Sequence, residues 1–271
     1  MRGSSRTSAR AVQETFQSVL DGQVDRARLG EDLFGITDAL DGTIALRRAV
    51  SDPSRDGADK AGLVEKLFGG KVSPEAVVVA KKAAGQRWAA ERDLTDTLES
   101  LAVASVVAAA EAQGRADQME DDLFRFERIV AGNPGLRDAL TDRRADPASK
   151  ESLVGSLLEG KANPEAVRLV RQAVRSPRGR RFDRVLDGYL AVASTRRDQL
   201  AATVTTAVAL DEEQRRRLAA ALSGYYAGKT VHLNVVIDPA VIGGIRVQVG
   251  DDVVDGTILR RLEAAKRHLG T

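Results

Sequence analysis

An internal repeat with a period of 90 residues limits the possible folds of this chain more than any other feature. Lys60 and Leu63 return as Lys150 and Leu153, and the Pro-Glu-Ala-Val segment at 74–77 returns unchanged at 164–167. Leu46-Arg47 likewise returns as Leu136-Arg137 in the same register. Because this period exceeds that of ordinary solenoid repeats, we expect each copy to be a small bundle of its own.

The apolar pattern within each copy predicts helices, because apolar residues recur at spacings of three and four. The matching stripes are Leu29, Leu33, Ile36 and Leu40 in the first copy, and Met119, Leu123, Phe126 and Val130 in the second. Ser73 and Asn163 each precede a proline, which is typical of a helix start. A long helix from Glu91 to Gln113 is expected to end copy one and begin copy two.

After Arg197 the pattern changes to alternation, which predicts strands. The first strand is predicted from Val204, Thr206, Val208 and Leu210. Asp211 and Gln214 fit a capping box for the next helix, with Leu218, Leu222 and Tyr225 on one face. Alternation at 233–237 and 245–249 predicts two more strands, with a turn at 250–252 and a last helix at 258–269.

The expected fold is therefore mainly α with a small α/β part. Two tandem helical bundles, copy one at 1–100 and copy two at 101–200, precede a strand-helix-strand-strand-helix domain at 201–271.

Composition excludes several classes of protein. The chain has no cysteine, so it can form neither a disulfide nor a thiolate metal site. Its 41 basic and 39 acidic residues nearly cancel, so the charge does not by itself indicate nucleic acid. The most apolar run, 101–110, is about half of the roughly 20 residues that a membrane span needs. We expect a soluble protein, or one held at a membrane only by its partners.

The segment after residue 237 carries a family resemblance. Its signature residues are Asp238, Pro239, Gly243, Gly244, Gly250, Asp251, Asp255, Gly256, Thr257 and Leu262. This pattern resembles the delta subunit of F-type ATP synthases, whose mitochondrial equivalent is the oligomycin sensitivity-conferring protein. Residues from about 101 to 271 resemble a complete ordinary member, although Thr257 stands where serine is usual. The extra copy before them resembles the duplicated actinobacterial form.

The resemblance implies a non-catalytic subunit of the peripheral stalk, or stator, that keeps the catalytic head from turning with the rotor during ATP synthesis. It implies that N-terminal helices of alpha subunits bind the helical part and that the b-type stalk subunit binds the C-terminal domain. The location implied is the cytoplasmic face of the cell membrane, reached through partners, with no cofactor, metal or catalytic residue. Copy two is expected to bind the head. Candidate partner-binding residues are Leu123, Phe126, Val130, Arg260 and Arg261.

Two other patterns suggest chemistry of a different kind. Gly155, Gly160 and Lys161 match a phosphate-binding loop, but Ala162 replaces the hydroxyl residue that binds magnesium, so a helix end is favoured over a nucleotide hydrolase. The second pattern is a run of arginines, Arg168, Arg171, Arg175, Arg178, Arg180, Arg181 and Arg184.

This arginine run is typical of a solvated face, with an acidic partner as the next interpretation. The alternative function is a basic helical adaptor that binds nucleic acid, although the scarcity of aromatic residues argues against it. His232, His268 and the aspartates after 237 lack the spacing of a metal site. Trp88, Tyr225 and Tyr226 are interpreted as packing residues.

Overall fold

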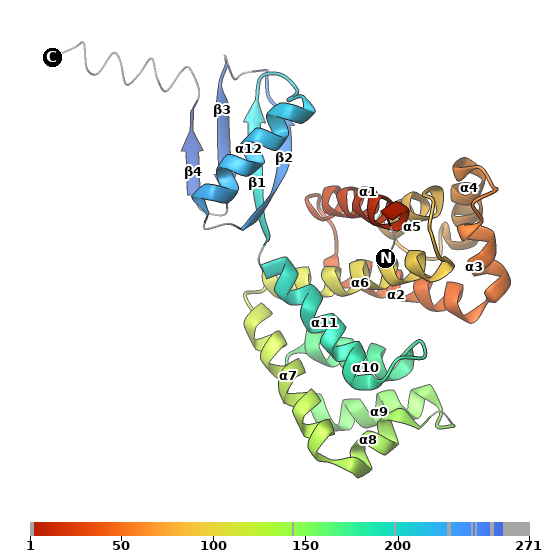
Figure 1. Ribbon diagram of the computed structural model, residues 1–271. Helices are drawn as coiled ribbons and strands as arrows, with labels where there is room; N and C mark the ends of the chain where they lie inside the picture. The colour runs from red at the N-terminus through yellow and green to blue at the C-terminus, as the bar shows by residue number, and fades with distance from the viewer. Residues whose placement is uncertain are drawn as a thin grey trace. The chain divides into compact units, whose positions relative to one another are not determined.

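The computed structural model describes residues 3–142, 144–197, 199–226, 229–239, 241, 243–249 and 252–256. The chain divides into two compact units, Met1–Ser194 and Thr195–Thr271, here called the helical unit and the small unit. Both are drawn in Figure 1, which shows helices throughout the first and a sheet with one helix in the second. The predicted class, mainly α with a small α/β part, is confirmed.

The helices of the helical unit follow the 90-residue repeat. Four helices of copy one, namely α2 (Arg26–Gly42), α3 (Ile44–Ser51), α4 (Gly57–Phe68) and α5 (Pro74–Gly85), return in order. Their counterparts in copy two are α7 (Ala116–Gly132), α8 (Pro134–Thr141), α9 (Pro147–Leu158) and α10 (Pro164–Arg175). The remaining helices are α1 (Gly3–Leu20), α6 (Glu91–Ala112) and α11 (Phe182–Arg197).

A pair of equivalent hydrogen bonds shows that the two copies also fold alike. The carboxylate of Asp32 accepts from the backbone N–H of Ser73 at 2.8 Å, and that of Asp122 accepts from Asn163 at 2.7 Å. Both bonds tie the second helix of a copy to the start of its proline-led helix. The helix starts predicted at Pro74 and Pro164 are confirmed.

Helix α6 is the long helix predicted between the copies, and it packs against α1 and α2 of copy one and against α7 and α10 of copy two. It is buried on more than one face for that reason. The predicted stripe residues of α2 and α7 are all buried with it in one hydrophobic core that runs from Val12 to Ala193. Because that core is shared, the division of the helical part at residue 100 stays a prediction.

The small unit contains four strands and one helix among its described residues: β1 (Gln199–Thr206), α12 (Glu212–Tyr225), β2 (Thr230–Ile237), β3 (Ile245–Val249) and β4 (Asp252–Asp255). The strand order is β2-β1-β3-β4, with β1 parallel to β2 and the other pairs antiparallel. Helix α12 connects the parallel pair and begins with the predicted capping box. Leu222 of α12 packs with Ala202, Val204, Val231, Val247 and Val249 of the sheet.

The structure corrects two details of the small unit. Strand β1 ends at Thr206, where the Thr206 hydroxyl donates to the Val208 carbonyl at 3.2 Å, so Val208 and Leu210 lie beyond the strand. A short strand β4 follows β3 directly and begins at Asp252, which was predicted to lie in a turn. Four residues are too few for alternation to reveal a strand. The predicted helix at 258–269 lies outside the described residues.

Candidate partner-binding surfaces

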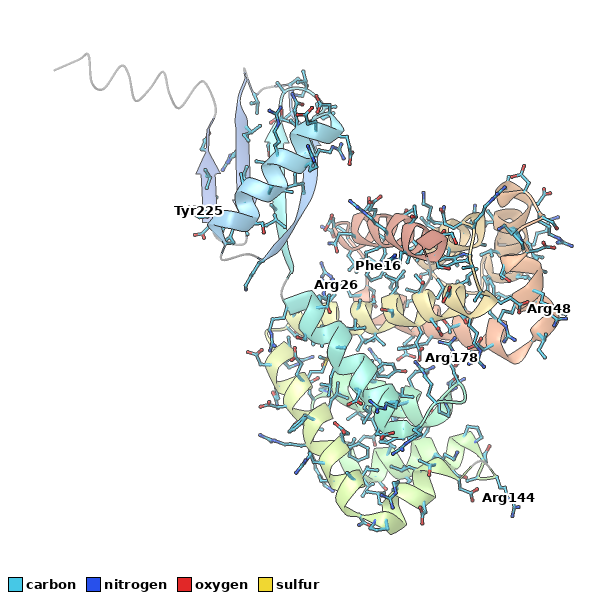
Figure 2. All side chains as sticks on the ribbon, in the orientation of Figure 1. Phe16, Arg26, Arg48, Arg144, Arg178 and Tyr225 are labelled. Atoms are coloured by element: carbon cyan, nitrogen blue, oxygen red, sulfur yellow. The ribbon has the colours of Figure 1, made fainter. Side chains whose placement is uncertain are left out.

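The arginine-rich segment is mostly engaged inside the helical unit. Arg178 is the clearest case, because its side chain is only 5% exposed and follows the end of α10 (Figure 2). Its guanidinium pairs with Glu99 at 2.6 Å and with Asp96 at 2.8 Å on α6, and also pairs with Asp41 on α2. Figure 2 shows Arg178 at the edge of copy two that meets these helices. The interpretation as a solvated face is therefore wrong for Arg178.

Glu99 is the acidic centre of this cluster and is 4% exposed. It also pairs with Arg180 and accepts a hydrogen bond from the Tyr189 hydroxyl at 3.1 Å. Burial raises the pKa of Tyr189 well above its usual value, and the charge of Glu99 adds to the effect. Burial also raises the pKa of Asp96, against the opposing influence of Arg178. The cluster joins α2 and α6 to the second copy through ion pairs centred on the buried Arg178 and Glu99.

A cavity of about 430 Å³ lies beside α2, α9 and α10 and has three arginines in its wall. Arg168 pairs with Glu31, Arg171 with Glu159 at 2.6 Å, and Arg175 with Asp38 and Glu151, both at 3.8 Å. Since each guanidinium already has a carboxylate partner, the cavity offers a phosphate little uncompensated positive charge.

Copy two contains a larger groove with a volume of about 830 Å³. It is lined by α7, α8, the start of α9, the end of α10 and the start of α11. Its apolar lining comes from Val130, Leu140, Ala173, Val174 and Phe182. Charged side chains also line it: Glu127, Arg137, Lys150, Arg175, Arg180, Arg181 and Asp183. A groove that combines apolar and charged side chains can hold an amphipathic helix.

Two cationic side chains in the groove have no partner among the described residues. Lys150 is 8% exposed, and Arg137 is exposed at the rim. The equivalent lysine of copy one, Lys60, instead donates to the Gln86 carbonyl at 2.9 Å. The Lys150 ammonium has no partner within the described part of the helical unit, so a carboxylate that enters the groove of copy two could pair with it.

In copy one, Trp88 packs beside the end of α5, the helix equivalent to α10. This side chain is 7% exposed, belongs to the core, and donates from its indole nitrogen to the Ala83 carbonyl at 2.8 Å. Ala83 is the counterpart of Ala173, which lines the groove of copy two. Position 178, the counterpart of Trp88, carries the arginine that turns toward α6 instead. Trp88 is thus the packing residue that was predicted.

The three helical residues predicted to contact a partner lie in the core. Leu123 is 0% exposed, Phe126 2% and Val130 3%, and the Phe126 ring packs edge-on against Phe182 at 6.2 Å between centroids. Only Val130 reaches the groove wall. The exposed large apolar residues of the same helix are Phe124 and Ile129. Arg260 and Arg261 lie outside the described residues.

The signature residues of the small unit form a turn and a strand end. The backbone N–H of Asp238 donates to the Thr206 carbonyl at 2.9 Å and thereby fixes the end of β2. Pro239 follows in the turn, and Gly243 and Gly244 adopt positive φ angles of 149° and 83°, which favour glycine.

Further along, Asp255 ends β4, and the Gly256 N–H donates to the Ile245 carbonyl at 2.9 Å. The signature residues Gly250, Asp251, Thr257 and Leu262 lie outside the described residues.

Apolar side chains are exposed on the small unit. Among the described residues they include Val236 and Ile237 of β2 and Val253 and Val254 of β4, which are 43–55% exposed. These strands are the two edges of the sheet as the structure describes it. Tyr225, labelled in Figure 2, is 74% exposed and stacks edge-on with Tyr226 at 5.1 Å. An exposed apolar set of this kind is typical of an interaction surface.

The patterns considered for other chemistry have structural explanations. Gly155 lies within α9, and Gly160 has a φ of 72° just after the helix ends, which is the predicted helix end and not a phosphate-binding loop. No cluster of three metal-binding side chains occurs in the described part of the chain. None of the helices described there has the length and hydropathy that a membrane span requires.

Sequence reasoning missed Lys150, Phe124 and the pair Glu99–Tyr189. Lys150 was read only as a repeat marker. Glu99 and Tyr189 are 90 residues apart, so their shared position in the repeat was a signal that could have drawn attention to them. Nothing local distinguishes exposed Phe124 from its buried counterpart Phe34, because both follow a leucine in the same stripe.

Comparison with known proteins gives a consistent result. The family model for "ATP synthase delta (OSCP) subunit" matches residues 102–269, beginning within α6. A protein named ATP synthase subunit delta from Kineococcus radiotolerans is 48% identical, with 96% of each chain covered. One of the same name from Streptomyces avermitilis is 43% identical over 99% of this chain and 98% of its own.

These relatives are matched nearly end to end, so the match to them, unlike the family model, includes the first copy. Among solved structures, a chain of the Toxoplasma gondii mitochondrial ATP synthase is 16% identical, covering 62% of this chain and 95% of that one. Its TM-score of 0.29 is too low to support an argument about the fold.

Proposed function

Because this chain belongs to the ATP synthase delta (OSCP) subunit family, it is a peripheral-stalk component of ATP synthase, and we propose how its two units divide that work. The helical unit binds an N-terminal helix of an alpha subunit in the groove of copy two. The small unit binds the b-type stalk subunit. The subunit performs no bond chemistry and sits on the cytoplasmic face of the membrane through these partners.

The groove of copy two is the observation that carries the proposal for the head. It combines an apolar lining with Lys150, which is unpaired among the described residues, whereas the equivalent Lys60 of copy one is already bonded to the Gln86 carbonyl. An amphipathic helix could place apolar anchors between α7 and α11 and a carboxylate near Lys150. A stator must dissociate slowly, and nanomolar affinity corresponds to about −12 kcal/mol.

A steric block tests this assignment. Thr141→Trp places a large ring at an exposed position that lines the groove, and it should weaken binding of the purified catalytic head at least tenfold. Ala139→Trp is the matched control, because Ala139 is exposed on the same helix and does not line the groove. If Val78→Glu in copy one weakens binding as much as Thr141→Trp, copy one is the site instead.

The exposed apolar strands of the small unit support its assignment to the b-type subunit. The chain cut after Leu200 keeps the whole helical unit and should lose binding of a b-subunit peptide measured by fluorescence anisotropy. Retention of full affinity by that shortened chain would refute the assignment.

The alternative of a nucleic-acid adaptor has no support from the family or from the arginine segment, whose members largely pair inside the helical unit. Binding to the head, which combines apolar contacts with one or two ion pairs, should weaken only modestly between low and high salt. A nucleic-acid binder would instead lose affinity steeply.

A further inference from the structure

One face of α2 packs against residues of copy two. Its residues are Glu31, Phe34, Asp38 and Asp41, whose spacing of three and four places them on one side of the helix. Glu31 pairs with Arg168, and Asp38 accepts from the Gln172 side chain at 3.3 Å. Asp41 pairs with Arg178, and the Phe34 ring lies 6.4 Å from that of Tyr189. Phe34 is therefore only 2% exposed.

The equivalent face of α7 is uncovered. We call it the α7 outer face, and it consists of Asp121, Phe124, Arg128 and Ala131, the residues 90 positions after those of the α2 face. All four are exposed, and Phe124 is 54% exposed where its counterpart is buried. The duplication has thus kept an aromatic anchor at a place that the described residues of the helical unit leave uncovered.

The charges of this face differ from those of α2. Arg128 replaces Asp38 and Ala131 replaces Asp41, while Asp121 keeps the acidic position of Glu31. Arg128 has no hydrogen bond or ion pair among the described residues, so its guanidinium is free to pair with a carboxylate. The α2 face pairs with arginines, whereas the α7 outer face can pair with an acidic side chain and contact an apolar one beside it.

This change disfavours a second copy of the chain as the occupant. A head-to-tail contact like the one inside the helical unit would set copy one against the α7 outer face. Inside the helical unit, Gln172 faces Asp38. The residue equivalent to Gln172 in copy one is Lys82, and the residue equivalent to Asp38 in copy two is Arg128. The head-to-tail contact would therefore place Lys82 opposite Arg128. Like charges facing each other oppose such a contact.

We propose that the α7 outer face is a docking surface for an amphipathic helix of the catalytic head, which sets a large apolar side chain on Phe124 and a carboxylate on Arg128. The face adjoins the groove of copy two, since Ala131 belongs to both. A helix seated in the groove can therefore extend over α7. This inference rests on the proposed function, because it takes the head as the partner.

The test uses the full chain and the purified catalytic head from which this subunit has been removed. Phe124→Glu and Arg128→Glu should each weaken binding at least tenfold, and the effect of Arg128→Glu should shrink at high salt. Ile129→Glu is the matched control, because Ile129 is 56% exposed on the same helix but points away from this face. It should bind within twofold of the unmodified chain, and all three variants should melt at the same temperature.

Each outcome decides between the possibilities. Full-strength binding of Phe124→Glu would overturn the inference and leave the proposed function intact, whereas failure of the unmodified chain to bind the head would overturn the proposed function. Equal losses from Ile129→Glu and Phe124→Glu would overturn the inference as well. Self-association of the unmodified chain in sedimentation, abolished by Phe124→Glu, would make a second copy the occupant.

Discussion

Removal of Arg178 should loosen the attachment between the two copies. In Arg178→Ala, the buried carboxylate of Glu99 loses its 2.6 Å ion pair, and Asp41 and Asp96 lose theirs. Breaking a buried ion pair by removing one partner costs about 3–5 kcal/mol. Glu99 keeps Arg180 and Tyr189 as partners, so we expect a loss near the lower end, about 3 kcal/mol.

This loss can be measured for the helical unit alone. The chain has one tryptophan, Trp88, and it lies in the core of that unit, so its fluorescence reports unfolding there and not in the small unit. For a unit of this size, 1 kcal/mol shifts the melting temperature by about 2–4 °C. Arg178→Ala should therefore melt roughly 6–12 °C below the unmodified chain.

An exposed arginine of the same segment provides the control. The Arg181 side chain is 82% exposed and pairs with Asp183 at 2.8 Å, so Arg181→Ala should change stability by less than about 1 kcal/mol. If Arg178→Ala melted at the same temperature as Arg181→Ala, the ion pairs of Arg178 would not contribute to the attachment of the copies. The double change Glu99→Gln and Arg178→Met should cost less than the sum of the single changes, because it leaves no charge uncompensated at Glu99.

Four further predictions concern packing and pH. A Cβ at Gly30 would lie 2.8 Å from Val106 and 3.1 Å from the Ala102 carbonyl of α6, so Gly30→Val should destabilise the chain by about 1–3 kcal/mol in urea unfolding. Gly35→Ala, in open space on the same helix, should instead stabilise it by about 0.5–1 kcal/mol. Trp88→Phe should leave a cavity in copy one and cost about 1–3 kcal/mol, seen as a lower melting temperature by circular dichroism. The raised pKa of Tyr189 disfavours its ionised form in the folded state, so the free energy of unfolding should fall as pH rises above the pKa of the unfolded chain, near 10. This fall should be steeper in the unmodified chain than in Tyr189→Phe. Equal dependence of the two free energies on pH would contradict the reasoning.

The repeat and the elements could be predicted from the sequence because they depend on local patterns. The stripe from Leu29 to Leu40 and its counterpart predicted α2 and α7, and Pro74 and Pro164 predicted two helix starts. The long helix α6 and the capping box of α12 were also expected. The family resemblance of the segment after residue 237 pointed to the family that the comparisons support.

The partner-contact residues could not be chosen in the same way. Leu123, Phe126 and Val130 were singled out from an apolar stripe, and the structure places that stripe in the core. An apolar stripe indicates only that something packs against that face of the helix, because core packing and partner binding favour the same side chains. The groove depends on residues from five helices, so no single segment of sequence contains it.

What the sequence determined by itself is the doubled helical unit and the order of elements after it, since hydrophobic periodicity and capping act over a few residues. Only the tertiary structure decided which helix faces of one copy are covered by the other copy. It buried Phe34 and left Phe124 exposed, and it placed Arg178 among three carboxylates that lie 79 to 137 residues away in the chain. The physical reason is that burial belongs to pairs of surfaces, so two nearly identical helices acquire different roles from what packs against them.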